Sequence, residues 1–321
     1  GVKLINGGIV HTGAYRALAV TAADVTVERM TFGRGTGWNP GDSLGYRAIV
    51  SVLAENFHSI DCDYNGSAHS CVHLANGVSD GAVIRGGTMT GTLAGQNAAG
   101  VYAQSGNTGN QNLTIEGVEV YGTTDGIILF DTGTSRVVGN YVHGLRVLPT
   151  LTLTGWTLVT GNIWRQRSAH GTNPGVDGPQ YDREDGNTTV VKLNGTPMTY
   201  VHDSSTPTSN TASYSNGYLY VNLGGTDPNT QTLTSDILSG YGITTYVTLL
   251  DGTNEHLMHG NRISDNRVED TDGIGIYLQL GAYDGAIGNS ATNNYLRNVD
   301  LKGSQTSSIP FAGIAVNAGQ D

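Results

Sequence analysis

Two short apolar patterns alternate along almost the whole chain, and they limit the available folds more than any other feature of the sequence. The first pattern is an apolar residue, four mostly small or polar residues, and a second apolar residue. Its copies are LINGGI (4–9), VERMTF (27–32), FHSIDC (57–62), IRGGTM (84–89), IEGVEV (115–120), VVGNYV (137–142), MHGNRI (258–263) and AIGNSA (286–291). The second pattern is a tight residue followed by apolar–x–apolar. Its copies are ALAV (17–20), IVSV (49–52), CVHL (71–74), GVYA (100–103), GIIL (126–129), YVTL (246–249), GIYL (275–278) and GIAV (313–316).

This alternation has a physical cause, because side chains of a strand point to opposite faces with period two. An apolar–x–apolar phrase therefore buries one face, and stacked repeats place equivalent apolar residues in columns about 4.8 Å apart. Most repeats run 22 to 32 residues, the size of one solenoid turn. Gly-Asn pairs at 139–140, 260–261 and 288–289 suggest a ladder of stacked amides at the corners. We predict an all-β fold, a right-handed parallel β-helix of about eight coils. A propeller or sandwich would need antiparallel hairpins, and regularly spaced Asn-Gly turns are missing.

One interruption divides the predicted solenoid. Residues 145–244 break the alternation and contain GWTLVTGNIW (155–164), TVVKLNGTPMTYV (189–201) and GYLYVNL (217–223). These phrases are typical of antiparallel strands with alternating faces. We therefore predict three parts: a first β-helix part at 1–144, an inserted antiparallel β-subdomain at 145–244, and a second β-helix part at 245–321. Insertions in solenoids gather on one face, often the binding face.

Charge and composition exclude several classes of partner. The net charge of −11 disfavours nucleic acid as a partner. The sequence has no apolar run of about 18 residues, so we predict no membrane span. Cys62 and Cys71 are too few for a disulfide scaffold, and we expect two thiols without a structural bond. The repeat begins at residue 4 and still runs at 316 without a cap. We therefore expect the chain to be part of a longer protein or of an oligomer.

Several phrases carry a resemblance to a known group of proteins. TTDGIILFD (123–131) and DTDGIGIYLQLG (270–281) resemble the repeats of pectate-lyase-like carbohydrate-active β-helix proteins. NRISDNRVEDTDGIGIYL (261–278) and NGYLYVNLGGTDPN (216–229) are similar to segments of β-helix glycoside hydrolases, and phage tailspike depolymerases share the solenoid. The resemblance implies a polysaccharide ligand, an extracellular or virion-surface location, and a homotrimer if the chain is a tailspike. It supplies no catalytic motif, and such phrases specify fold better than reaction.

The outward positions of the second pattern predict a binding strip. If the aliphatic residues face inward, their neighbours face outward on one flat sheet. Aromatic rings give an apolar stacking surface, and amides match sugar hydroxyls. The alternative is that Tyr and His are ordinary strand residues. The predicted strip consists of His73, Tyr102, Gln104, Phe130, Tyr277 and Gln279.

Carboxylates on the same strands suggest the chemistry. Asp131 and Asp251 fall at one position of successive copies, about 4.8 Å apart by strand spacing. That is close to the separation of a retaining glycosidase pair, in which repulsion would raise one pKa. Asp125 and Asp272 precede the same kind of strand, and the four carboxylates together could hold Ca²⁺. Ordinary turn chemistry is the competing explanation for all four carboxylates, and Asp125 and Asp272 fit it as Asp-Gly pairs.

The insertion adds a second set of candidates, and two other functions compete with hydrolysis. Trp164 and Arg167 could contact substrate, and Asp182 or Glu184 of the charged segment 175–187 could supply an acid or base. A lyase would use a His or Tyr base with a cation that neutralises a uronate. A non-catalytic adhesin or tailspike would only bind glycans. No zinc-ligand spacing is convincing.

Overall fold

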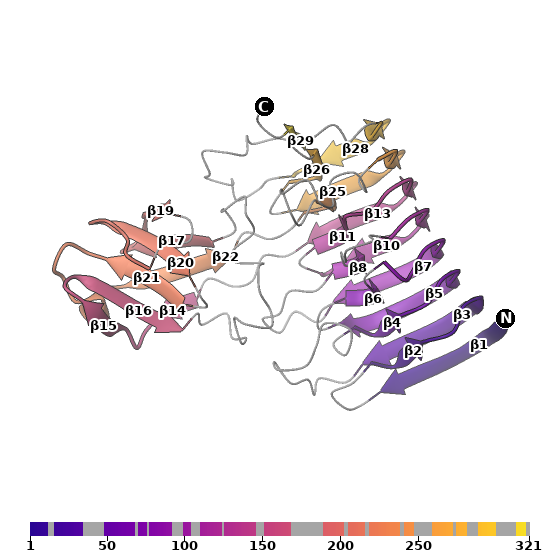
Figure 1. Cartoon of the computed structure of the whole chain (residues 1–321), viewed down its shortest axis with the longest axis horizontal. Helices are drawn as coiled ribbons and strands as arrows, with labels where there is room; N and C mark the ends of the chain where they lie inside the picture. Colours follow the sequence, from indigo (N-terminus) through magenta and orange to yellow (C-terminus); the bar gives the residue numbers. More distant parts are fainter. Residues whose placement is uncertain are drawn as a thin grey trace.

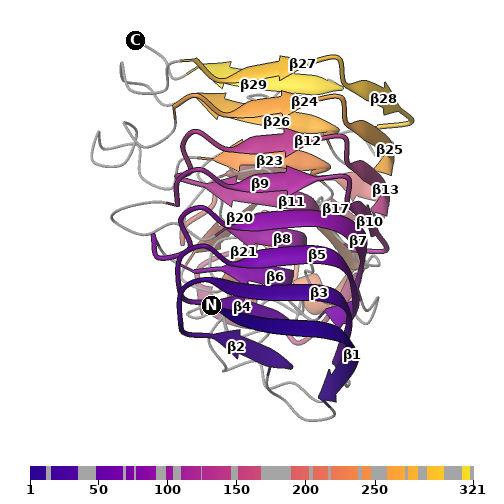
Figure 2. The same cartoon turned by 90° about the vertical axis from the view of Figure 1, so that its right-hand side faces the viewer.

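The computed structural model describes residues 1–11, 16–34, 48–67, 70–75, 77–91, 99–103, 110–123, 125–145, 151–167, 189–201, 205–215, 218–237, 241–246, 259–271, 274–280, 288–299 and 313–318. Over these residues the chain is all-β, and its helical structure is limited to a short 3-10 turn, η1 (Pro228–Thr230). Figures 1 and 2 show two stacks of parallel strands running side by side, with a group of antiparallel strands apart from them. None of the helical structure described is long and apolar enough to span a membrane.

Strands alternate between two parallel sheets along the chain. Each strand pairs with its equivalent one repeat earlier, as when Leu4 lies opposite Val27 and Val50 opposite Val72. The larger sheet, sheet A, contains β1 (Val2–His11), β3 (Val25–Arg34), β5 (His58–Ser67), β7 (Val83–Gly91), β9 (Thr114–Glu116), β10 (Glu119–Tyr121), β12 (Arg136–Val138), β13 (Tyr141–Leu145), β24 (Arg262–Ser264), β25 (Arg267–Thr271), β27 (Ser290–Thr292) and β28 (Tyr295–Arg297). Sheet B contains β2 (Leu18–Val20), β4 (Val50–Val52), β6 (Ser70–Leu74), β8 (Ala99–Ala103), β11 (Asp125–Phe130), β23 (Ile243–Tyr246), β26 (Ile276–Leu280) and β29 (Ile314–Ala318).

Sheet A bends sharply at one residue of every repeat. That residue lies in the left-handed backbone region, where Gly, Asn and Asp are tolerated best. The bend separates a first row of strands, represented by β9, β12, β24 and β27, from a second row represented by β10, β13, β25 and β28. The bend residues are Asn6, Arg29, Asp61, Gly86, Gly117, Gly139, Asp265 and Asn293. At the one bulky member, the Arg29 Nε donates to the Asn6 Oδ1 at 2.7 Å.

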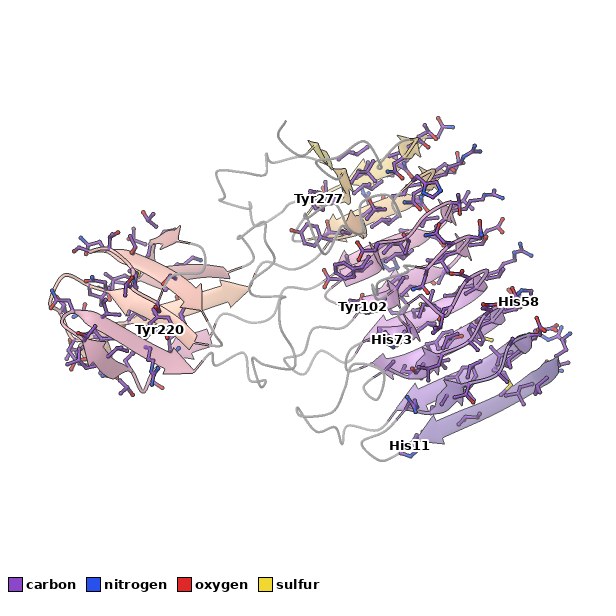
Figure 3. The ribbon with its side chains drawn as sticks, in the orientation of Figure 1. His11, His58, His73, Tyr102, Tyr220 and Tyr277 are labelled. Atoms are coloured by element: carbon purple, nitrogen blue, oxygen red, sulfur yellow. The ribbon has the colours of Figure 1, made fainter. Side chains whose placement is uncertain are left out.

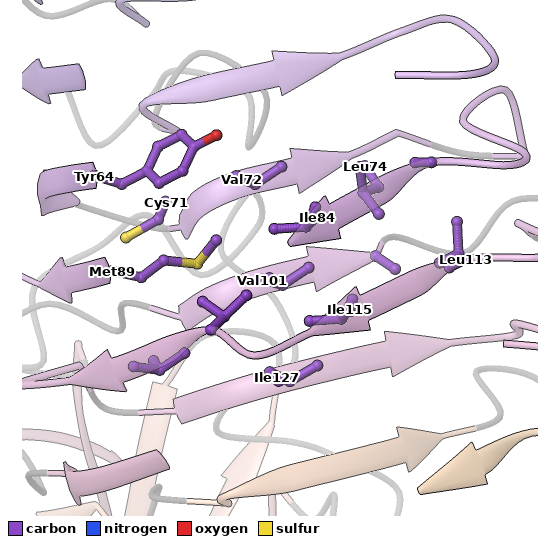
Figure 4. Close-up of a cluster of buried hydrophobic side chains, with 14 of the residues drawn as sticks. Tyr64, Cys71, Val72, Leu74, Ile84, Met89, Val101, Leu113, Ile115 and Ile127 are labelled. Atoms are coloured by element: carbon purple, nitrogen blue, oxygen red, sulfur yellow. The ribbon is translucent and has the colours of Figure 1, made fainter. Parts of the chain in front are cut away.

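An aliphatic core fills the space between the sheets. Val72, Val101 and Ile127 of sheet B are fully buried against Ile84 and Ile115 of sheet A (Figure 4). Their burial confirms the inward columns predicted from the repeat. Both cysteines lie in this core as free thiols, with Cys62 donating to the Ile60 carbonyl and Cys71 to the Thr90 carbonyl. Burial raises the pKa of the Cys62 thiol.

The predicted register of one sheet B strand is wrong, and the correct register places a glycine in a column with those of neighbouring strands. All eight predicted copies of the second pattern overlap strands of sheet B, but YVTL (246–249) shares only Tyr246 with β23 and does not represent it. Ile243, and not Val247, lies opposite Ile127, so the true copy is GITT at 242–245. Gly242 thereby joins a column in which a Cβ atom would strike the carbonyl oxygen of the next glycine. Its members are Gly100, Gly126, Gly242, Gly275 and Gly313.

The amide ladder exists, but the sequence prediction aligned it incorrectly. Asn140 stacks on Asn266, whose Oδ1 accepts from the Asn140 backbone N–H at 3.0 Å and from its Nδ2 at 2.9 Å. Asn266 repeats both contacts with Asn294, each at 3.0 Å. The predicted copies at 258–263 and 286–291 are therefore five residues out of register, because Ile263 and Ala291 occupy the level of Val137. Asn261 and Asn289 stack separately, beneath Ser135.

The strands of residues 151–237 form two further sheets with antiparallel pairing. One has the order β14 (Leu151–Leu153), β22 (Leu233–Ile237), β17 (Thr189–Leu193), β18 (Thr196–Pro197). The other has the order β15 (Thr157–Thr160), β16 (Ile163–Arg167), β21 (Tyr218–Asn222), β20 (Thr211–Ser215), β19 (Thr199–Val201), with β19 and β20 parallel. Leu153, Trp156, Leu219, Val221 and Leu233 form their own apolar cluster. These strands lie within the predicted insertion 145–244, and Leu151 of its first strand pairs with Ser235 of its last.

Candidate functional site

The outward row of sheet B brings most of the predicted strip together. His73 lies opposite Tyr102, Tyr102 opposite Ile128, and Thr244 opposite Tyr277. Thr244 takes the place that Thr248 would hold if YVTL (246–249) were the copy on this strand. Figure 3 shows His73, Tyr102 and Tyr277 on the side of the parallel stack nearer the antiparallel strands.

The rings of this row stack on one another from repeat to repeat. The ring centroids of His73 and Tyr102 are 5.8 Å apart, and those of Tyr102 and Phe130 are 5.3 Å apart in an edge-to-face arrangement. Further along, Tyr241 and Tyr277 lie 5.7 Å apart. The rings thus fall into two groups, one of three and one of two, and we call the five residues together the sheet B strip: His73, Tyr102, Phe130, Tyr241 and Tyr277.

The sheet B strip is packed, although the sequence prediction treated its face as open. His73 is 3% exposed, Phe130 8% and Tyr277 0%, whereas Tyr102 is half-buried. Phe130 and Tyr277 belong to an apolar cluster with Ile128 and Ile274, separate from the main core. Alternation along a strand identifies the outward face, but it does not reveal whether other parts of the chain cover that face.

The register on which the predicted carboxylate pair rested is wrong. Phe130 lies opposite Tyr246, whereas a pairing of Asp131 with Asp251 would require Phe130 opposite Leu250, and Asp251 itself lies outside the described residues. Asp131 is buried in a left-handed conformation directly after β11, whereas Asp125 is buried at its start and accepts from the Tyr241 N–H at 3.2 Å. Six strand residues span about 20 Å, so these two carboxylates cannot act on one bond or share one Ca²⁺. Among the residues described, no three His, Cys, Asp or Glu side chains gather as metal ligands.

Several predicted residues cannot be placed in the site. Gln104, Asp251 and Asp272, together with Asp182 and Glu184, lie outside the described residues. The same holds for the side chains of Gln279 and Arg167, although their backbones belong to β26 and β16. Trp164 is half-buried and packs against the apolar cluster of the insertion, so at least part of its role is structural.

A second cluster, on the outer face of sheet A, was missed by sequence reasoning. It lies on β10, β13, β25 and β28, where Val120, Val142, Val268 and Leu296 point into the core and their neighbours point outward. We call it the sheet A cluster: Glu119, Tyr121, Tyr141, His143, Arg267, Glu269, Tyr295 and Arg297. The phrases EVY, YVH, RVE and YLR carried the signal, an apolar residue flanked by rings and charges in four successive repeats.

Glu269 is the electrostatic centre of this cluster. Its carboxylate is 1% exposed and accepts from Arg267 at 2.9 Å and from Arg297 and the Tyr141 hydroxyl at 3.1 Å. Burial alone would raise the pKa of Glu269, but the hydrogen bonds from Arg267 and Tyr141 and the two guanidinium charges outweigh it and lower that pKa. Burial and the hydrogen bond to Glu269 raise the pKa of Tyr141.

The lowered pKa of Glu269 predicts a pH-dependent contribution to stability. Because the folded-state pKa is depressed, the contribution is complete above the ordinary pKa of 4.5 and is lost as the pH falls through the folded value. We expect Glu269→Gln to lower the thermal unfolding midpoint at neutral pH, and the gap from wild type to close below about pH 4.5. Unfolding followed by circular dichroism across this range measures it.

A surface ion pair provides the control for that measurement. Arg85 and Glu116 lie 3.0 Å apart with side chains 56% and 42% exposed, so Glu116→Gln should have little effect at any pH. A gap between wild type and Glu269→Gln that stays constant down to strongly acidic pH would contradict the role assigned to the Glu269 charge.

Comparison with known proteins adds no identification, since no family model, curated protein or solved structure matches the chain.

Proposed function

We propose that the two parallel sheets are the faces of a right-handed parallel β-helix. Each repeat passes through the first row of sheet A, the left-handed bend, the second row of sheet A and then sheet B. The shared aliphatic core and repeats of 22 to 32 residues fit this arrangement. Parallel crossover connections are right-handed in about 98% of cases, which supports the hand.

We further propose that a long carbohydrate binds at the sheet B strip, with half-buried Tyr102 as its contact because His73, Phe130 and Tyr277 are packed, and that the chain hydrolyses it. The observation that carries this proposal is the stacked row His73, Tyr102 and Phe130, with the buried residue Asp131 directly after Phe130 at the end of β11. Rings with polar edges suit the faces and hydroxyls of sugars. An acid placed at the end of such a strip is suited to protonate a glycosidic oxygen, and its partner carboxylate would come from outside the described residues.

Release of reducing ends from a panel of plant and bacterial polysaccharides tests this proposal. We expect product from at least one polymer, and Asp131→Asn should lower the rate by about a hundredfold or more. Asp265→Asn is a matched control, because Asp265 has the same left-handed conformation on the other sheet and Asn293 occupies its place one repeat later. Wild-type turnover by Asp131→Asn would remove Asp131 from the mechanism.

A lyase is the second candidate, and one contact favours it. The His73 ring stacks on Tyr102, which places two groups able to act as a base side by side in the strip. β-Elimination leaves an unsaturated sugar that absorbs in the ultraviolet, so the same digests distinguish the two reactions. Binding without any product would instead indicate an adhesin or tailspike function. An extracellular or virion-surface location and a homotrimer belong to the proposal in that case.

A further inference from the structure

The sheet A cluster has features of a binding surface that the sheet B strip does not provide. Its residues form two adjacent rows across four successive repeats. One row is Glu119, Tyr141, Arg267, Tyr295, and the other is Tyr121, His143, Glu269, Arg297. Earlier repeats carry small side chains at the same levels: Thr31, Asp63 and Thr88 in one row, Gly33, Asn65 and Thr90 in the other. The rings and arginines therefore belong to one stretch of the sheet and are not a general feature of the fold.

Planar groups stack through this surface without interruption. The Tyr121 and His143 ring centroids are 5.3 Å apart, and those of His143 and Tyr141 are 4.1 Å apart. The Arg267 guanidinium lies 4.8 Å from the Tyr141 ring and 5.8 Å from the Tyr295 ring. The ladder ends in exposed rings, since Tyr121 is 38% and Tyr295 54% exposed. A ladder that served only packing would be expected to bury its terminal rings.

The charges of the cluster are compensated within it. The His143 Nε2 and Glu119 Oε1 lie 3.0 Å apart, and Glu269 is held by Arg267 and Arg297. Apart from His143, two carboxylates (Glu119 and Glu269) balance two guanidinium groups (Arg267 and Arg297). The surface thus presents fixed donors and acceptors between rings with no net charge, which fits a neutral polyhydroxylated ligand better than a polyanion.

The geometry points to a second carbohydrate-binding surface: we propose that the sheet A cluster binds a neutral oligosaccharide laid along the axis of the parallel stack. Successive strands repeat at about 4.8 Å, close to the length of one pyranose unit, so each repeat can offer one set of contacts per sugar. Glu269 is a positioning residue, because its buried carboxylate fixes both guanidinium groups and leaves their outer edges exposed. This surface does not depend on the sheet B strip.

Affinity electrophoresis in native gels tests the proposal, with xylan, glucomannan and mixed-linkage β-glucan as neutral probes and polygalacturonate as the charged one. We use Tyr102→Ala as the background, so that binding at the sheet B strip does not obscure the result. At least one neutral polymer should retard this protein, and adding Tyr121→Ala and Tyr295→Ala should weaken binding about tenfold. Leu158→Ala, which removes an exposed apolar side chain 51% accessible in the insertion, should change nothing.

Three results of the gel assay would overturn the proposal. These are no retardation by any neutral polymer, retardation that is unchanged by the two added substitutions, and binding to polygalacturonate alone. Sedimentation of the same proteins tests whether the surface joins copies of the chain instead. A change in oligomeric state caused by Tyr121→Ala and Tyr295→Ala, without a change in retardation, would also overturn it. The interpretation of these binding results does not change if the chain shows no hydrolysis, or if Asp131→Asn keeps wild-type turnover.

Discussion

Gly126→Ala should destabilise the chain severely, by about 3 kcal/mol or more, the upper end of what overpacked cores usually show. The new methyl group would strike the carbonyl oxygen of Gly242 and lie 2.6 Å from the Val142 Cγ1. Neither obstacle can move cheaply, because one is backbone of the neighbouring strand and the other is a core side chain. Chemical denaturation followed by circular dichroism measures the loss of unfolding free energy.

Gly8→Ala is the matched control for that substitution. Gly8 also lies in a parallel strand with an ordinary backbone conformation, but a Cβ atom there would meet nothing nearer than the Thr31 carbonyl oxygen at 3.6 Å. Its unfolding free energy should change by less than about 0.5 kcal/mol. Equal effects of the two substitutions would show that close stacking of glycines does not limit the spacing of sheet B.

Asn266→Ala should have the second largest effect, a loss of about 3 kcal/mol. Asn266 is 1% exposed, its Oδ1 accepts both the backbone and side-chain N–H groups of Asn140, and its Nδ2 donates to the Val137 carbonyl at 2.9 Å. Alanine leaves these groups buried without partners, and such groups cost about 1–3 kcal/mol each. Denaturant unfolding again gives the magnitude.

Asn65→Ala is the control that distinguishes the loss of a buried ladder amide from the loss of any asparagine side chain. Asn65 is exposed on the same sheet and accepts one hydrogen bond from Thr90 at 3.1 Å. Water can replace that contact, so we expect less than about 0.5 kcal/mol. Similar losses of unfolding free energy for Asn65→Ala and Asn266→Ala would contradict a special contribution of the buried amide stack to stability.

The sequence predicts the parallel strands well because one-sided burial imposes a period of two. Val72, Val101, Ile127 and Leu129 are all fully buried, as their pattern requires. Register is harder to predict across the insertion, since YVTL and GITT both fit an apolar strand. The glycine before Ile243 was the usable signal, because the two later sheet B strands also have Gly at that place, as Gly275 and Gly313. The apolar spacing of the first pattern likewise fits both the predicted copy at 258–263 and the observed one at 263–268.

The candidate site could be predicted only in part. Period two places His73, Tyr102 and Tyr277 in one outward row, and the structure agrees. Their burial depends on tertiary packing, which no strand pattern encodes. The sheet A cluster was missed for another reason. The first sequence pattern spans two short strands, one on each side of the bend at Gly139 or Asp265. Read as a single strand, it does not show that rings and charges alternate with core residues in the second row.

The pairing of β14 with β22 bears on how the chain folds. Residues that pair across the insertion are 126 apart in sequence, against 22 for an ordinary neighbouring repeat. Closing the longer loop costs about 1.5 kcal/mol more conformational entropy, from (3/2)RT ln(126/22). Leu151 lies opposite Ser235, so once the insertion has folded its two ends are already adjacent. If the insertion folds first, the last repeats join the stack without most of this entropic penalty.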